Sequence, residues 1–522
     1  MSFDLHDLFK RELREIPTPR QERWVPSPSP RGSHPHIARR ALSAAVVVAV
    51  VVASVVGGEL LGRIREQFAA SPSSYRDLPS FQASRDFVYV AEGGLGQDYF
   101  QEWAMPEGAR ESRLVGRGVV GSIADRYPLR TGGDLAALPV WHNGGYPAQT
   151  ADTYLQLISL DNGAPTYRIG TGLVHLPGGP TDSGPEVAGT FMGEAAVSVD
   201  GTSVFYVRDE GLGSRVTQLM RFDTSGVRSG AITRPAAQRT WGDPSTGDAI
   251  WSRVIPLDPQ HIALVRQHVR SEDLTGRAYV RYQDWYFLDA DLHVISSYAS
   301  AGYGALAPGG ICSFDPIHLP SGGWALVCSA ETGGVITSVH FLDGRTFKDQ
   351  AVTVNGDAWG APLGGAVTSD GKLAILTNNP AVLRYDIGAH RMIDERNVTA
   401  ASALDRFMPS LALGKEPGAP AIQFTPDGHF AYVAVDRSLW WGGIAVVDLQ
   451  QAKLVMHSTA IANTVLALHL TADGHRLYAL GTDADGTTTT LALVDPSNLK
   501  VIARSAPSAD SSVAIFAVAQ RH

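Results

Sequence analysis

Asp427-Gly428-His429-Phe430-Ala431-Tyr432-Val433 and Gly443-Ile444-Ala445-Val446-Val447-Asp448 are the two stretches that decide the fold. The first is an Asp-Gly turn followed by an apolar strand, and the second is an apolar strand that ends in Asp. A further short strand, Lys453-Leu454-Val455, follows after a few polar residues. Asp-Gly between alternating strands is a strong hairpin signal, and Asp favours turns because its side chain bonds to nearby backbone. These stretches therefore predict successive antiparallel strands.

Both elements recur along the chain. The apolar strand that ends in Asp occurs seven times, at Asp161, Asp223, Asp289, Asp343, Asp386, Asp448 and Asp495. The Asp-Gly turn before an apolar strand occurs at Asp200, Asp370, Asp427 and Asp473, with degenerate copies before Ile262 and Trp324 and a strand of the same type at 87–90. Units of about 40 residues or more with four strands each are typical of β-propellers. We therefore expect an all-β fold, a seven-bladed β-propeller over residues 81–522, with an insertion at 92–150.

The last strand predicts how such a ring closes. Residues 512–518 form an apolar stretch with no hairpin partner after it. An open ring would expose two sheet edges. We therefore expect this strand to pair into the first blade.

The repeat resembles a known family. Ile375-Leu376-Thr377-Asn378 stands where the family has Tyr-Val-Thr-Asn, and the stretch 443–448 also matches. The domain is similar to bacterial extracytoplasmic β-propellers of the YVTN type, which are related to the heavy chain of quinoprotein amine dehydrogenase. The resemblance implies a propeller architecture over about 440 residues and transfers no activity, since one fold hosts many functions.

The N-terminal segment predicts a membrane anchor. Residues 41–58 carry no charge, and together with Leu60 and Leu61 they are long enough as a helix to cross the ~30 Å hydrocarbon layer. We expect a transmembrane helix at 41–61 that contacts the lipid bilayer. Eight Lys and Arg residues precede it, and such basic flanks stay in the cytosol. The chain is therefore predicted to be a single-pass cell-membrane protein with an extracytoplasmic C-terminal domain.

Two linking pieces flank this helix. Residues 1–40 are expected to hold a cytosolic amphipathic helix at 3–16, with Leu5, Phe9 and Leu13 on one side, and then a disordered linker. That helix either lies on the membrane surface or docks a cytosolic protein. Residues 62–80 are expected to be the exterior linker.

Composition excludes several classes of protein. Hydrophobic residues make up 44% and charged residues 18%, with a formal net charge of −9. Such a balance excludes general nucleic-acid binding, which needs a basic face. The two cysteines, Cys312 and Cys328, are too few for a cysteine zinc cluster. They flank the turn at 319–322 at equal distances from Pro320, so we expect them to face each other and to form a disulfide outside the cytosol.

The loops after the second strand of each blade are expected to lie on one face and to bind ligand. The candidate ligand-binding residues are Trp440, Trp441, Arg437, Asp209, Glu210, Arg270, Glu331 and Asn378, with Trp141 and His142 from the insertion. Adjacent tryptophans in a loop favour burial against a ligand or against the insertion, although alternation would place one of them in the core.

No catalytic residue, metal site or cofactor is assigned. The stretch 243–251 resembles the repeat of pyrroloquinoline-quinone dehydrogenases, but it occurs once. We expect a membrane-anchored extracytoplasmic module that binds or scaffolds a protein, peptide or carbohydrate ligand. The alternatives are a propeller enzyme (lactonase-like, lyase-like or a quinone-dependent oxidoreductase) and a transmembrane signalling partner with a cytosolic docking helix.

Overall fold

The computed structural model describes most of the second of two compact units, Ala69–His522. The described residues are 77–93, 99–107, 109–113, 132–143, 150–159, 165–175, 194–210, 216–225, 234–242, 249–271, 278–301, 311–312, 315–329, 336–354, 362–378, 380–399, 422–435, 442–462, 464–482, 488–505 and 512–520. In this part of the chain no helix is long and apolar enough to cross a membrane. The predicted helix at 3–16 and the predicted span at 41–61 lie outside it.

The named elements are all strands, and they form eight sheets, numbered here in chain order. Sheet 1 contains β1 (Asp86–Gly93), β2 (Tyr99–Met105), β3 (Ala109–Arg113) and β32 (Ser512–Gln520). Sheet 2 contains β4 (Leu135–Asn143), β5 (Thr150–Ser159) and β6 (Pro165–His175). Sheet 3 contains β7 (Glu194–Val197), β8 (Ser203–Glu210), β9 (Val216–Asp223) and β10 (Ala237–Gly242).

The next two sheets carry the site described below. Sheet 4 contains β11 (Ala249–Asp258), β12 (His261–Ser271), β13 (Ala278–Asp289) and β14 (Val294–Ala301). Sheet 5 contains β15 (Ile311–Cys312), β16 (Ile317–His318), β17 (Trp324–Ser329), β18 (Ile336–Leu342) and β19 (Asp349–Val354), with both β15 and β16 paired to β17.

The last three sheets repeat the four-stranded plan. Sheet 6 contains β20 (Pro362–Val367), β21 (Lys372–Thr377), β22 (Ala381–Asp386) and β23 (Arg391–Asn397). Sheet 7 contains β24 (Ile422–Phe424), β25 (Phe430–Ala434), β26 (Ile444–Asp448) and β27 (Lys453–Ser458). Sheet 8 contains β28 (Thr464–Leu470), β29 (Leu477–Thr482), β30 (Thr489–Val494) and β31 (Val501–Arg504).

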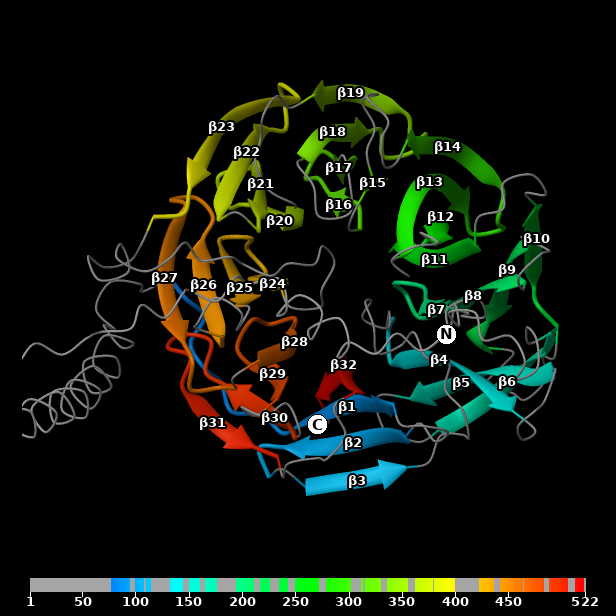
Figure 1. Ribbon diagram of the computed structural model, residues 1–522, viewed down its shortest axis with the longest axis horizontal. Coiled ribbons are helices and arrows are strands. Elements are labelled where there is room, and N and C mark those ends of the chain that lie inside the picture. The colour runs from blue at the N-terminus through cyan, green and yellow to red at the C-terminus, as the bar shows by residue number, and fades with distance from the viewer. Residues whose placement is uncertain are drawn as a thin grey trace, which may run out of the picture. The chain divides into compact units, whose positions relative to one another are not determined.

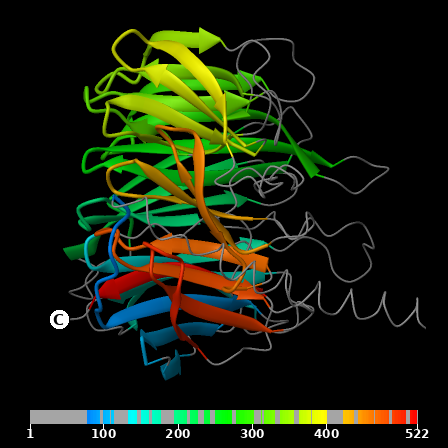
Figure 2. The same cartoon turned by 90° about the vertical axis from the view of Figure 1, so that its left-hand side faces the viewer.

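The sheets pack face to face in chain order. Buried apolar clusters join sheets 2 and 3, 3 and 4, 4 and 5, 5 and 6, 6 and 7, 7 and 8, and finally 8 and 1. In Figure 1 the first strands, such as β7, β11, β20, β24 and β28, lie toward the centre and the fourth strands lie at the rim. Figure 2 shows the strands of successive sheets stacked with similar directions. This is the architecture of a β-propeller, as the repeats predict.

The described residues form eight sheets, whereas the sequence pattern indicated seven blades. The sequence pattern places the strand at 87–90 and the strand that ends near Asp161 in one blade. They lie in different sheets, because β1 forms its own hairpin with β2 and β3, and β5 pairs with β4 and β6. The segment 92–150, expected to be an insertion, thus contributes β2, β3 and β4.

The C-terminal strand closes sheet 1. β32 pairs antiparallel with β1, from Asp86 opposite Gln520 to Gly93 opposite Ser512. The predicted closure between the two ends of the domain is therefore confirmed. The residues before β1 add a second link, because the side chain of Leu78 is buried in the core between sheets 7 and 8, and His475 Nδ1 lies 2.7 Å from the Ser80 carbonyl.

Side chains of Asp shape both kinds of turn. In the Asp-Gly turns, a Ser or Thr two residues earlier donates its hydroxyl to the Asp, as Ser198 does to Asp200 at 2.7 Å and Thr425 to Asp427 at 2.6 Å. In the turns after the third strands the Asp accepts from backbone, as in Asp343, whose bonds from Thr346 first and then Arg345 lower its pKa to about 2. The Ser or Thr position was not part of the predicted motif.

The glycine of the Asp-Gly turn is testable by substitution. Gly428 has a φ of 66°, and an added Cβ would lie 2.0 Å from the Val367 carbonyl oxygen. Gly371 has a similar φ of 73°, but no heavy atom of the described residues lies within 4 Å of such a Cβ. We expect G371A to cost about 1 kcal/mol from left-handed backbone alone, and G428A to cost about 2 kcal/mol more because the backbone must move. Urea unfolding of both variants measures this difference, and equal losses would contradict it.

Candidate functional site

Large polar side chains are buried mainly in sheet 4. Seven Arg, Gln and His side chains are buried in the described part of the chain, and the five in this sheet are Arg253, Arg266, Gln267, His268 and Gln283. Burying such groups costs free energy unless they are paired or hydrogen-bonded. Their concentration in one sheet therefore marks it as the candidate functional site.

The sheet acquires these residues by extending its strands. After its first residue, His261, β12 continues with Ile262-Ala263-Leu264-Val265, which corresponds to the short apolar second strands of sheets 6, 7 and 8. Those strands, β21, β25 and β29, have 6, 5 and 6 residues, whereas β12 has 11 and β13 has 12. The extra length of β12 starts at Arg266, and alternation sends Arg266 and His268 to one face and Gln267 to the other.

The face toward sheet 3 holds a buried hydrogen-bonded group. Arg266 donates from Nε to Thr217 Oγ1 on β9 at 3.0 Å, and Thr217 Oγ1 lies 3.1 Å from Ser252 Oγ on β11. The three side chains come from three strands and two sheets. They lie beyond the apolar core that the two sheets share.

An imidazole and a carboxylate extend this group. His268 Nε2 lies 2.9 Å from Asp284 Oδ2 on β13, and the His268 ring stacks on Tyr282 with centroids 3.8 Å apart. Arg266 Nη1 is 3.9 Å from the same Asp284 oxygen, which is too long for a hydrogen bond. Asp284 is 22% exposed, while Arg266 is 3% and His268 0% exposed. Solvent therefore reaches the group on the Asp284 side.

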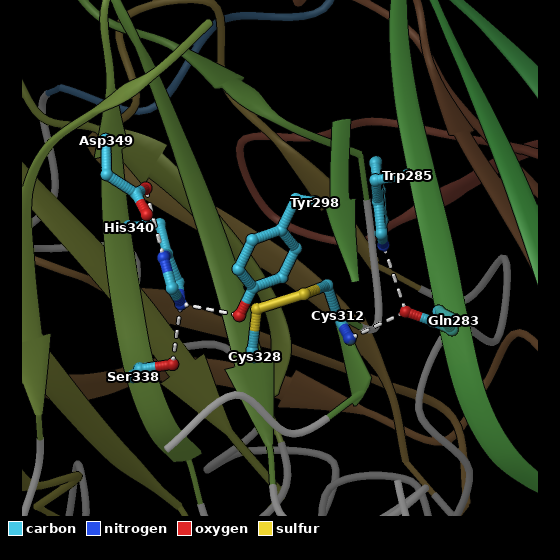
Figure 3. Close-up of a disulfide and its surroundings, with 8 residues drawn as sticks. All are labelled: Gln283, Trp285, Tyr298, Cys312, Cys328, Ser338, His340 and Asp349. Carbon is cyan, nitrogen blue, oxygen red and sulfur yellow. Dashed lines mark hydrogen bonds and ion pairs between the residues drawn. A yellow bond between two sulfur atoms is a disulfide. The ribbon is translucent and has the colours of Figure 1, made fainter. Parts of the chain in front are cut away.

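The face toward sheet 5 is organised around Gln283 and a disulfide (Figure 3). Gln283 Oε1 accepts from Trp285 Nε1 at 3.1 Å and from the backbone N–H of Cys312 at 2.9 Å. Cys312 on β15 lies opposite Cys328 on β17, and the two are joined by a disulfide. The side chain of Gln283 thus ties sheet 4 to the short strand that carries Cys312.

The disulfide should contribute to stability. It closes a loop across a sequence separation of 16 residues, and in the chain-entropy account a loop of that size is worth about 3 kcal/mol. We expect the double variant C312A/C328A to lose about this much free energy of unfolding in urea. A reducing agent should shift the wild-type midpoint and leave the midpoint of the variant unchanged, whereas no reductant effect on the wild type would contradict the prediction.

A second chain of hydrogen bonds continues outward along the same interface. His340 Nε2 lies 3.0 Å from Ser338 Oγ and 3.1 Å from Tyr298 Oη, and His340 Nδ1 lies 3.1 Å from Asp349 Oδ1. Burial, and then the nearby Asp349 charge, raise the pKa of Tyr298 to about 12, so the phenol stays protonated. Figure 3 shows Tyr298 from sheet 4 reaching the His340 of sheet 5 beside the disulfide.

Serine, histidine and aspartate in this order can activate a nucleophile in principle. Here the side chain of Ser338 is wholly buried at 0% exposure, so a substrate has no surface on which to approach its hydroxyl. The chain of bonds instead links β14 of sheet 4 to β18 and β19 of sheet 5. The described residues contain no group of three or more His, Cys, Asp or Glu side chains that could hold a metal ion.

The backbone locates several predicted ligand-binding residues. Asp209 and Glu210 end β8, Arg270 lies next to the last residue of β12, and Asn378 directly follows β21. Trp141 and His142 lie near the end of β4, opposite Thr153 and Asp152. Asp209, Glu210, Arg270 and Asn378 are thus at the ends of the second strands of their sheets, whereas Trp141 and His142, expected in an insertion, are on β4, the first described strand of sheet 2. Glu331, Arg437, Trp440 and Trp441 lie outside the described residues.

Two of these positions adjoin the buried group. Asp209 pairs with Thr217 across β8 and β9, and Arg270 follows His268 by two residues on β12. The site itself was missed in the sequence. Its signal was present, since Arg266-Gln267-His268 extends a strand whose counterparts in sheets 6, 7 and 8 end in Thr or Ala.

Comparisons with known proteins give likeness at the level of solved structures. No protein-family description matches the chain, and no curated protein matches it. It is similar to the C-terminal WD40 domain of Sif2 (TM-score 0.37, 11% identity, 77% of this chain and 93% of that one) and to apo AztD from Citrobacter koseri (0.41, 10%, 84% and 98%). The Dos1 propeller gives a TM-score of 0.38 at 12% identity, over 77% of this chain and 92% of that one. Likenesses of this degree say nothing of what this chain binds.

Proposed function

We propose that the chain is a membrane-anchored extracytoplasmic propeller that acts as a binding or scaffolding module for a protein, peptide or carbohydrate ligand. In this proposal the eight sheets are the blades of one ring of the YVTN type. The observation that carries it is the position of the second-strand ends. Those of β8, β12 and β21, together with the end of β4, bear the candidate binding residues, and the ends of β8 and β12 adjoin the buried polar group.

The fold supports binding at these strand ends. Strand ends on a rigid scaffold are where proteins commonly place ligand-contacting side chains, because the sheets hold them in fixed positions. The end that carries the Asp-Gly turns differs, since its Asp side chains are engaged by their own turns, as at Asp200 and Asp427. We therefore assign ligand binding to the end formed by the second-strand termini.

A binding screen with matched variants tests this assignment. The purified full chain is labelled and applied to a glycan array and to a displayed peptide library. Hits are then repeated with the double variant D209N/R270Q and with the control R345Q, whose exposed side chain lies in a turn at the opposite strand ends. We expect D209N/R270Q to weaken binding at least about tenfold and R345Q to leave it unchanged. The reverse pattern would refute the assignment.

The anchor is tested separately. With residues 41–61 in the membrane and the N-terminus cytosolic, protease added to intact spheroplasts should degrade a C-terminal tag and leave an N-terminal tag intact. A protected C-terminal tag would refute this orientation without bearing on ligand binding.

A hydrolase is the second candidate, because Ser338, His340 and Asp349 have the required order of hydrogen bonds. The burial of Ser338 argues against it. A fluorophosphonate probe labels accessible activated serines. We expect the probe to label the wild type and S338A equally little. Labelling of the wild type that S338A abolishes would replace the binding proposal by an enzymatic one.

A further inference from the structure

Arg266 holds a buried guanidinium whose hydrogen bonds are mostly unmade. Its Nε donates to Thr217, its Nη1 is 3.9 Å from the nearest carboxylate oxygen, and its Nη2 has no hydrogen-bond partner. A guanidinium carries five N–H donors, and the side chain is only 3% exposed. A charge buried in this way is costly unless an acceptor completes it.

The other two buried arginines of the described chain each have a terminal or Nε nitrogen within 2.7 Å of a carboxylate, although Arg253 Nε itself has no hydrogen-bond partner. Arg253 Nη2 lies 2.7 Å from Asp315, and Arg476 Nε lies 2.6 Å from Asp86. The half-buried Arg384 shows a full fork, with Nε and Nη2 at 2.7 and 2.6 Å from the two oxygens of Asp394. Arg266 differs because the nearest carboxylate, Asp284, is bonded to His268 instead.

We propose that Arg266 binds a carboxylate group of the ligand. Its Nε is held by Thr217, so the two terminal nitrogens form the end-on fork that matches a carboxylate in a bidentate pair. Approach is from the side of Asp284, the exposed member of the group. Repulsion from the Asp284 charge makes the expected affinity for a simple carboxylate weak, on the order of 1 mM. The inference rests on the proposed binding function and names the chemistry of its ligand.

The carboxylate could be a small free anion or the C-terminus of a peptide. Isothermal titration and thermal unfolding of the purified full chain, with acetate and succinate against chloride at equal ionic strength, test the first source. A short peptide with a free C-terminus, compared with its C-terminal amide, tests the second. We expect a saturable rise in Tm with at least one carboxylate and none with chloride or with the amide.

Variants assign the effect to this residue. R266Q should abolish the saturable shift, and R266K, which keeps the charge without the fork, should weaken it at least about tenfold. R384Q, which removes a guanidinium already filled by Asp394, should leave it unchanged. If R266Q does not fold, the comparison of the Tm shift in R266K with that in R384Q decides whether the carboxylate binds Arg266.

Two results would overturn the proposal. One is the absence of any saturable carboxylate effect on the wild type, and the other is an effect that R266K and R266Q retain. A ligand from the array or library that binds the wild type and R266Q equally would also refute the carboxylate contact at Arg266, while leaving the proposed binding function in place.

Discussion

Replacing Arg476 by methionine is expected to lower the free energy of unfolding by about 3–5 kcal/mol, because it leaves a buried carboxylate without its cation. Asp86, the first residue of β1, is 0% exposed, and Arg476, which directly precedes β29 of sheet 8, is 4% exposed. Arg476 Nε and the Tyr478 hydroxyl both donate to Asp86 Oδ2 at 2.6 Å. Burial first, and then Asp86, raise the pKa of Tyr478, so the phenol remains a donor.

The position of this pair explains the size of the effect. Asp86 belongs to sheet 1, Arg476 directly precedes β29, and Tyr478 lies on β29 of sheet 8, so the bonds cross the boundary where the two ends of the domain meet. Arg476 Nη1 also lies 3.4 Å from the Gln82 carbonyl of the segment that precedes β1. Without the guanidinium, the Asp86 carboxylate is left buried with no cation beside it, which weakens the contact between the sheets.

Urea unfolding of R476M measures the loss, and two further variants interpret it. Arg85, the residue before Asp86, forms an exposed pair with Glu107, and the two side chains are 63% and 52% exposed. R85M should therefore cost less than about 1 kcal/mol. The double variant D86L/R476M should recover part of the loss, since apolar residues can replace a buried pair. A loss in R476M no larger than in R85M would contradict the prediction.

The sequence predicts the repeated strands and the closure, but it undercounts the sheets. Counting relied on strands that end in Asp and on Asp-Gly turns, because both reflect turn chemistry that is local to the chain. Sheet 1 has neither. β2 ends at Met105 before Pro106, and no Asp-Gly pair precedes β1. β32, from the far end of the chain, supplies the strand that pairs with β1. This pairing joins residues distant in sequence, so no local turn motif marks it.

The candidate site is harder to predict for a related physical reason. Its residues come from β9, β11, β12 and β13, and what brings Thr217 to Arg266 is the packing of sheet 3 on sheet 4. The residues singled out in the sequence come from expected loops, where exposure makes function a natural expectation. A polar residue inside a strand, such as Arg266 or Gln283, gives a weaker signal until its burial is known.

Deleting residues 512–522 is expected to remove more than about 5 kcal/mol, comparable to the whole stability of a domain. β32 is the innermost strand of sheet 1, and β1 pairs with it along its entire length from Asp86 to Gly93. The deletion would expose the edge of β1 and uncover the core between sheets 8 and 1, against which Val518 packs. Unpaired edges of this kind promote aggregation.

The test measures solubility, proteolysis and thermal unfolding of the truncated chain against the full chain. Because the missing element is a single strand, a synthetic peptide of residues 510–522 should restore folding in trans by adding to the edge of β1, as extended peptides do at open sheet edges. A scrambled peptide of the same composition serves as the control, because it keeps the apolar content and loses the alternation that fits the register. Rescue by the native peptide alone would show that the specific pairing of β32 with β1 closes the ring. A truncated chain as soluble and as thermally stable as the full one would show that the contacts between sheets, together with the Asp86–Arg476 pair, hold the domain closed without this strand.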